Sequence, residues 1–243
     1  MDIQDDLPFI IPAITVNGSV IGGNAVAAGD ISVAGDIGAL TIGGDLRAGV
    51  ANTGGIGVQG HVGLLTIGGD IVGSVEVSPN AQVDVFRGVD LFRIGGSIRG
   101  NVNQSARIDI GSNLGARAVG TLLVSGNMDY ATITTDEDGD ALLGRIKVSG
   151  DWIASRLAIG TTEGPDQIYG TDDDVLDEIG DGGVGKLTIK GQLLGTVADG
   201  DSFRIMARHI GKIKVGEVLY PLTAGSDNLA LGPTPDVHAF DVG

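Results

Sequence analysis

The sequence predicts an all-β protein built as a parallel β-helix, or β-solenoid, on three observations. A seven-residue pattern recurs along the chain, glycine punctuates it, and no stretch keeps the 3.6-residue period of a helix over three turns. Glycine accounts for 43 of the 243 residues, well above its usual share of about 7 %. With 42 % hydrophobic and 19 % charged residues, the composition is that of a folded chain and not of a disordered one.

The repeated pattern reads apolar, any, apolar, any, glycine, any, apolar. In chain order it appears as ITVNGSV, LTIGGDL, LTIGGDI, FRIGGSI, LLVSGNM, IKVSGDW, LTIKGQL and a shortened IKVGEV, which begin at Ile14, Leu40, Leu65, Phe92, Leu122, Ile146, Leu187 and Ile213. Four of the seven steps between these starts are 25–27 residues long, and a weaker copy begins nine residues before several strong ones. The spacing predicts about eight coils of about 26 residues, each with three short strands.

Stacking lets each short strand pair in parallel with its equivalent one coil away, which buries the apolar faces. Alternation places Leu40 and Ile42 inward and Thr41 outward. The third motif position therefore predicts one continuous column of aliphatic side chains: Val16, Ile42, Ile67, Ile94, Val124, Val148, Ile189 and Val215. A period near 26 suits a three-faced, right-handed β-helix, since left-handed hexapeptide solenoids have shorter coils. The blades of a propeller, at about 40–45 residues, do not fit this period.

Two further motif positions have structural roles. The glycine at the fifth position falls on the inward phase, where we expect a side chain to block the bend between faces. The residue after it runs through the coils as Ser19, Asp45, Asp70, Ser97, Asn127, Asp151 and Gln192. Short polar side chains of this kind bond to nearby backbone N–H groups, so we expect them to cap the corners and not to bind a substrate.

The two ends of the chain lie outside the solenoid of residues 14–218. Residues 1–13 and 219–243 both contain proline, which blocks further strand pairing. One interpretation is that they are caps. The other is that they are connectors, which would join subunits end to end into a homo-oligomer or filament, because the unblocked edge of a stack pairs with a neighbour.

An acidic insertion at residues 161–183 lengthens one coil and is a candidate binding site because of its many carboxylates. It contains eight acidic residues and no lysine or arginine. Ca²⁺ takes 6–8 oxygen ligands, so this loop predicts a calcium site formed by Asp166, Asp172, Asp173 and Asp174, and the alternative is a solvated acidic loop. Asp136, Asp138 and Asp140 are a weaker candidate, because Ala141 and Lys147 stand where an EF-hand has glycine and glutamate.

The segment GPDQIYGTDDD resembles the GxDGxYGTxDD-type calcium loops of large bacterial exported proteins, from which it departs at Gln167 and Asp174. The repeat units, LTIGGDI and its relatives, are similar to β-helical stretches of giant bacterial cell-surface proteins. Together these resemblances imply a Ca²⁺-stabilised protein that is extracellular or at the cell surface. The start of the chain is acidic and does not have the pattern of a signal peptide, so we expect either a cytoplasmic chain or an excised or mature fragment of a larger protein.

Charge and motif content exclude several functions. A net charge of −16 argues against binding to nucleic acid or to anionic membrane surfaces. No apolar run approaches the ~18 residues of a membrane span. No Ser-His-Asp arrangement or phosphate-binding loop is legible, and Trp152, the one tryptophan, falls on a core position. We therefore expect a non-catalytic structural protein. The alternative is a carbohydrate-binding or polysaccharide-degrading β-helix, against which stand the few aromatic residues and the absence of basic residues in the 161–183 loop.

Overall fold

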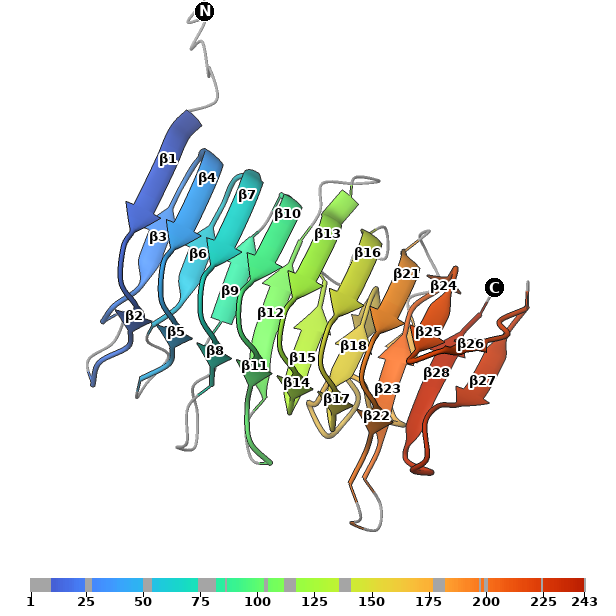
Figure 1. Ribbon diagram of the computed structural model, residues 1–243. Coiled ribbons are helices and arrows are strands. Elements are labelled where there is room, and N and C mark those ends of the chain that lie inside the picture. Colours follow the sequence, from blue (N-terminus) through green and yellow to red (C-terminus); the bar gives the residue numbers. More distant parts are fainter. Residues whose placement is uncertain are drawn as a thin grey trace, which may run out of the picture.

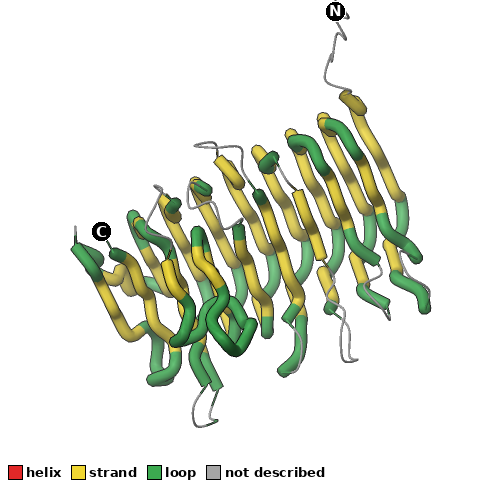
Figure 2. Tube along the Cα trace, turned by 180° about the vertical axis from the view of Figure 1, so that it is seen from behind, coloured by secondary structure: helices red, strands yellow, loops and turns green. Residues whose placement is uncertain are grey.

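The computed structural model describes residues 10–24, 28–49, 54–73, 82–85, 87–102, 105–111, 117–135, 141–176, 182–196, 198, 201–223 and 225–242. Over these residues the chain contains no helix and folds as a β-solenoid of about six turns (Figures 1 and 2). The predicted fold class, an all-β stack of mostly parallel strands, is confirmed. Because the described residues form no helix, none of them belongs to a helix that could span a membrane.

The first sheet collects the strong copies of the motif. Its parallel strands, in spatial order, are β1 (Ile10–Val16), β4 (Asp36–Ile42), β7 (Val62–Ile67), β10 (Val89–Ile94), β13 (Arg117–Val124), β16 (Leu142–Val148), β21 (Gly183–Ile189) and β25 (Ile213–Val215). The register joins Val16 to Ile42 and continues at this motif position to Val215, while the pairing of β13 with β16 shifts register only at its start, between Arg117 and Val119. The predicted aliphatic column is therefore confirmed, and its members from Ile42 to Ile189 are at most 1 % exposed.

Two further sheets complete each turn, which gives the three short strands per coil that the spacing predicts. The second sheet holds two-residue strands: β2 (Val20–Ile21), β5 (Leu46–Arg47), β8 (Ile71–Val72), β11 (Ile98–Arg99), β14 (Met128–Asp129), β17 (Trp152–Ile153) and β22 (Leu193–Leu194). The parallel part of the third sheet holds β3 (Ile31–Val33), β6 (Ile56–Val58), β9 (Gln82–Val85), β12 (Ala106–Ile110), β15 (Ala131–Thr134), β18 (Arg156–Ala158), β23 (Phe203–Met206) and β28 (Val237–Asp241). Trp152 is fully buried, as its motif position predicts.

The C-terminal segment folds back over the last coil. Strand β26 (Val218–Tyr220) returns antiparallel to β25, and β27 (Asp227–Ala230) pairs antiparallel with β28; the short β24 (His209–Ile210) pairs with β21. Antiparallel strands therefore end the first and third sheets here, although β28 itself still pairs in parallel with β23. The shortened eighth copy of the motif forms β25, which pairs in parallel with β21 and then enters this hairpin. The expected count of eight coils is not confirmed, and the right-handed coiling of the solenoid stays a prediction.

The N-terminal end of the stack, opposite β28 in Figure 1, is different. There β1, β2 and β3 each pair with a strand on one side only, as far as the described residues show. Ile10 and Ile21 on these strands are 58 % and 62 % exposed. Most of the predicted N-terminal cap, residues 1–9, lies outside the described residues.

A line of polar side chains, here called the polar ladder, joins successive turns from Ser19 to Gln192. The side chains of the first six ladder residues each accept a hydrogen bond of 2.7–3.0 Å from the backbone N–H of the ladder residue one turn further on, in the order Ser19, Asp45, Asp70, Ser97, Asn127, Asp151 and Gln192, where Gln192 only donates. The expected bonds to backbone N–H groups are confirmed. The location of the bonded N–H group differs from the expectation, because each bond links neighbouring turns and does not close a corner of the same turn.

The polar ladder also corrects the reason given for the glycine at the fifth motif position. A Cβ on this glycine would overlap the acceptor oxygen of the ladder residue one turn back, as it does at Gly44, Gly69, Gly96, Gly126, Gly150 and Gly191. These glycines are half-buried and face the ladder, not the aliphatic core. Glycine is therefore needed because a polar side chain of the neighbouring turn occupies the space a Cβ would fill.

Candidate metal site and the adjoining arginine cleft

The acidic insertion is described over residues 161–176, and the antiparallel pair β19 (Thr161–Thr162) and β20 (Val175–Leu176) brings its two ends together. The loop between them lies against the third sheet. The backbone N–H of Arg204 on β23 donates to the Gly170 carbonyl at 2.9 Å. Gly170 has a φ of +79° and leaves no room for a Cβ against the aliphatic stem of Arg156 on β18. The insertion is thus held on the sheet by its own backbone.

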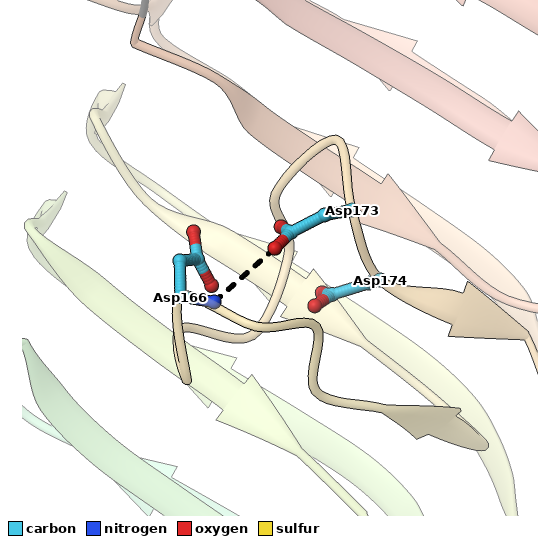
Figure 3. A group of neighbouring side chains, drawn as sticks. All are labelled: Asp166, Asp173 and Asp174. Carbon is cyan, nitrogen blue, oxygen red and sulfur yellow. Dashed lines mark hydrogen bonds between the residues drawn. The ribbon is translucent and has the colours of Figure 1, made fainter.

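Three of the four predicted calcium ligands come together in this loop. One carboxylate oxygen from each of Asp166, Asp173 and Asp174 lies within 4.8 Å of the other two (Figure 3). Asp174 is buried, at 9 % exposure, whereas Asp166 and Asp173 face solvent. Three carboxylates at this spacing offer the all-oxygen donor set that a hard cation takes.

Hydrogen bonds within the loop hold these carboxylates in place. Asp174 accepts the backbone N–H groups of Gly164 (3.0 Å), Gly170 and Thr171 (3.2 Å). Asp173 accepts the Thr171 hydroxyl at 2.7 Å and the backbone N–H of Asp166 at 3.2 Å. The same bonds suit a loop closed by its own acidic side chains, so the cluster fits a cation without requiring one.

The electrostatic environments of the two central aspartates differ. Burial raises the pKa of Asp174 above its ordinary value of 3.8, and this outweighs the three backbone N–H bonds that favour its charged form. The hydrogen bond from the Thr171 hydroxyl lowers the pKa of exposed Asp173. A bound cation would offset the cost of ionising Asp174, because an opposite charge at this distance favours the carboxylate.

The fourth predicted ligand is directed elsewhere. Asp172 pairs with the Arg204 guanidinium at 2.6 Å and accepts the Ser202 hydroxyl at 2.6 Å, and this hydroxyl is the main cause of its lowered pKa. The structure therefore separates Asp172 from the three-aspartate cluster. The weaker candidates Asp136, Asp138 and Asp140 lie outside the described residues.

Beside the loop lies a feature that the sequence did not reveal, here called the arginine cleft. It has a volume of about 310 Å³, and its lining includes Arg107, Tyr130, Arg156, Gln167 and Tyr169. The register of the third sheet aligns Arg107 with Thr132 and Thr132 with Arg156, so both arginines stand in one column beneath the insertion. The loop sequence lacks basic residues, but the folded protein supplies them from β12 and β18. Neither arginine lies in a copy of the seven-residue motif, so the repeat pattern offered no signal for the cleft.

Comparison of this chain with protein-family models, with curated proteins and with solved structures found no match. The resemblance of its repeats and of its acidic loop to those of bacterial surface proteins accordingly stays a prediction from the sequence.

Proposed function

We propose that this chain is a non-catalytic structural module of a bacterial cell surface or extracellular matrix, stabilised by Ca²⁺ at the cluster of Asp166, Asp173 and Asp174. The observation that supports it best is the unbroken polar ladder above an unbroken aliphatic column. Together they use one polar and one apolar motif position to join successive turns, the first by hydrogen bonds and the second by packing. A rod built in this way is suited to act as a spacer or scaffold.

Two of the three histidines, His61 and His238, form side-chain contacts with an acidic and an amide residue. His61 lies 3.2 Å from Asp90, and His238 lies 2.8 Å from Asn228. Neither contact joins the imidazole to a serine or threonine hydroxyl, which a histidine-activated nucleophile needs. Both histidines are at least partly exposed on the surface of the rod.

Calcium is the part of the proposal with the most direct test. Binding to the folded state alone adds about 2.7 kcal/mol at a hundredfold excess over Kd, which corresponds to a rise in Tm of about 5–10 °C for a chain of this size. Thermal unfolding should therefore be recorded in Ca²⁺, in Mg²⁺ and in chelator. Equal Tm values in Ca²⁺ and chelator would remove calcium from the proposal.

A matched pair of variants locates the effect. Asp166→Asn removes a carboxylate of the cluster, so it should abolish the Ca²⁺-dependent rise in Tm. Asp172→Asn makes the same change in the same loop at a residue that faces Arg204, so the rise should persist. The opposite pattern would show that the cation binds elsewhere.

Assembly remains part of the proposal in a narrower form. The folded-back C-terminal segment occupies its own last coil, which leaves the edges of β1, β2 and β3 for contact with another copy of this chain. Light scattering at high protein concentration, with and without Ca²⁺, should detect this association. A strictly monomeric protein would contradict it.

A further inference from the structure

The arginine cleft contains one arginine, Arg156, that forms no ion pair with the described residues, although Glu163 and Asp201 also line the cavity. Arg156 on β18 is half-buried, and its guanidinium lies 4.6 Å from the centre of the Phe203 ring. Its Nε donates to the Ser202 carbonyl at 3.3 Å, and it forms no ion pair with any residue that the structure describes. The carboxylates of Asp166, Asp174 and Asp201 attract the guanidinium electrostatically, but they lie beyond ion-pair distance. A desolvated cation without a paired anion is costly, so this site favours an anionic ligand.

The second arginine of the cleft is also incompletely satisfied. Arg107 lies over the Tyr169 ring at 4.9 Å, donates through Nη2 to Asp109 at 2.8 Å, and its Nη1 lies 4.0 Å from the Glu163 carboxylate. Its Nε, however, is buried and has no hydrogen-bond partner. Buried donors of this kind usually have a partner. Arg107 on β12 and Arg156 on β18, with β15 between them, thus place two guanidinium groups at one cavity.

The backbone around the cleft is strained where it forms the lining. Tyr130 and Gln167 have φ values of 46° and 58°, a region that non-glycine residues rarely adopt. They are two of the three described non-glycine residues with a positive φ, and both line the cavity. Strain of this kind persists where the surrounding structure fixes a residue, and it gathers at binding sites.

The rest of the lining indicates the type of ligand. The other polar lining residues supply amide, hydroxyl and carboxylate groups, which suit the hydroxyl groups of a sugar better than a hydrophobic molecule: Asn101, Ser105, Thr132, Glu163 and Asp201. At the rim, Val102 and Ile168 are 75 % and 45 % exposed and offer apolar contact for the C–H face of a ring. The volume of about 310 Å³ accommodates a small ligand or one or two units of a chain that continues into solvent.

We infer that the arginine cleft binds a uronic acid unit of an acidic polysaccharide, whose carboxylate pairs with Arg156 and whose hydroxyl groups bond to the polar lining. The site goes beyond the proposed structural function, because it would attach the rod to an acidic glycan. It requires no cation, so it can be tested in chelator, and its failure would leave the calcium proposal untouched.

The experiment measures binding of tetragalacturonate to the full chain by isothermal titration calorimetry in chelator at low ionic strength. Maltotetraose, a neutral sugar of the same length, is the control ligand. Tetragalacturonate should bind at least tenfold more tightly than maltotetraose, because hydrogen bonds to a charged group contribute more than neutral ones. Equal affinities, or no binding of tetragalacturonate at millimolar concentration, would overturn the inference.

Variants then place the binding in the cleft. Arg156→Gln should weaken tetragalacturonate binding about tenfold or more, and Arg156→Lys should restore part of it. Arg145→Gln is the matched control, since Arg145 is an exposed arginine on β16 in the first sheet. Affinity that is unchanged in Arg156→Gln, or lost equally in Arg145→Gln, would contradict the assignment.

A pair of rim variants keeps the test decisive if Arg156→Gln does not fold. Val102 is exposed, so Val102→Glu and Val102→Lys should both leave the fold intact. The glutamate should weaken tetragalacturonate binding about two- to fivefold and the lysine should strengthen it, with both effects diminished by salt. Maltotetraose binding should not respond to either charge. Equal effects of the two variants on tetragalacturonate would count against the cleft.

Discussion

The polar ladder and the loop of residues 161–176 both use aspartate to accept backbone N–H groups, but over different distances along the chain. In the ladder, Asp70 and Asp151 bond to residues 27 and 41 positions away, one turn further on. In the loop, the bonds that Asp173 and Asp174 accept from the backbone span at most 10 positions. The ladder therefore ties the turns of the stack to one another, whereas the loop bonds shape one local segment.

The comparison teaches that environment, and not residue type, decides what an aspartate does here. The ladder residue Asp45 has a lowered pKa, mainly because the backbone N–H of Asp70 bonds to its carboxylate. The loop residue Asp174 accepts more such bonds, yet burial raises its pKa. The ladder spaces one polar group per turn, while the loop gathers three carboxylates within 4.8 Å. Only the second arrangement is suited to a cation.

The largest expected effect comes from breaking the ladder through its glycine. In Gly96→Ala, the new Cβ would overlap the Asp70 carboxylate and lie 2.8 Å from the backbone carbon of Gly69. Overpacking together with the loss of a ladder bond should lower the free energy of unfolding by about 3 kcal/mol. Urea unfolding measures this. Gly57→Ala is the control, because no atom lies within 4 Å of its added Cβ, and a similar loss there would contradict the explanation.

A smaller effect is expected from removing one ladder acceptor. Asp151→Ala leaves the backbone N–H of Gln192 without its partner at 2.8 Å, so the free energy of unfolding should fall by about 1–2 kcal/mol. Asp151→Asn should cost less than about 0.5 kcal/mol, because asparagine already serves as the acceptor one turn earlier, at Asn127. Equal losses in the two variants would mean that the charge, and not the hydrogen bond, holds the turns together.

The smallest expected effect separates the two regions by pH in the absence of Ca²⁺. The lowered pKa of Asp45 stabilises the fold above the ordinary value of 3.8, and this contribution is lost as the pH falls below it. The raised pKa of Asp174 works in the opposite sense, so its contribution decreases as the pH rises above 3.8. From about pH 3 to 6, the stability of wild type relative to Asp45→Asn should rise, and that relative to Asp174→Asn should fall. Two slopes of the same sign would refute this difference between ladder and loop.

The sequence by itself determined the fold class, the strand register and the ladder positions. A seven-residue motif repeated at 25–27 residues leaves few ways to bury its apolar faces, and alternation then fixes which side chains point inward. The alignment of Val16 with Ile42 and the row from Ser19 to Asp151 followed from counting residues alone. The acidic composition of residues 161–183 likewise indicated the segment in which three aspartates come together.

Only the tertiary structure decided which groups meet across turns. The ladder bonds run between coils because the backbone N–H one turn away lies within reach of each polar side chain. The sequence motif alone predicted bonds within one corner and not between coils. Asp172 leaves the aspartate cluster because Arg204, 32 residues later in the chain, lies beside it and pairs with it. The arginine cleft arises because Arg107 and Arg156, far apart in sequence, are brought into one column by the register of the third sheet. Such contacts depend on how an irregular insertion packs against regular turns, and a repeat pattern does not encode that packing.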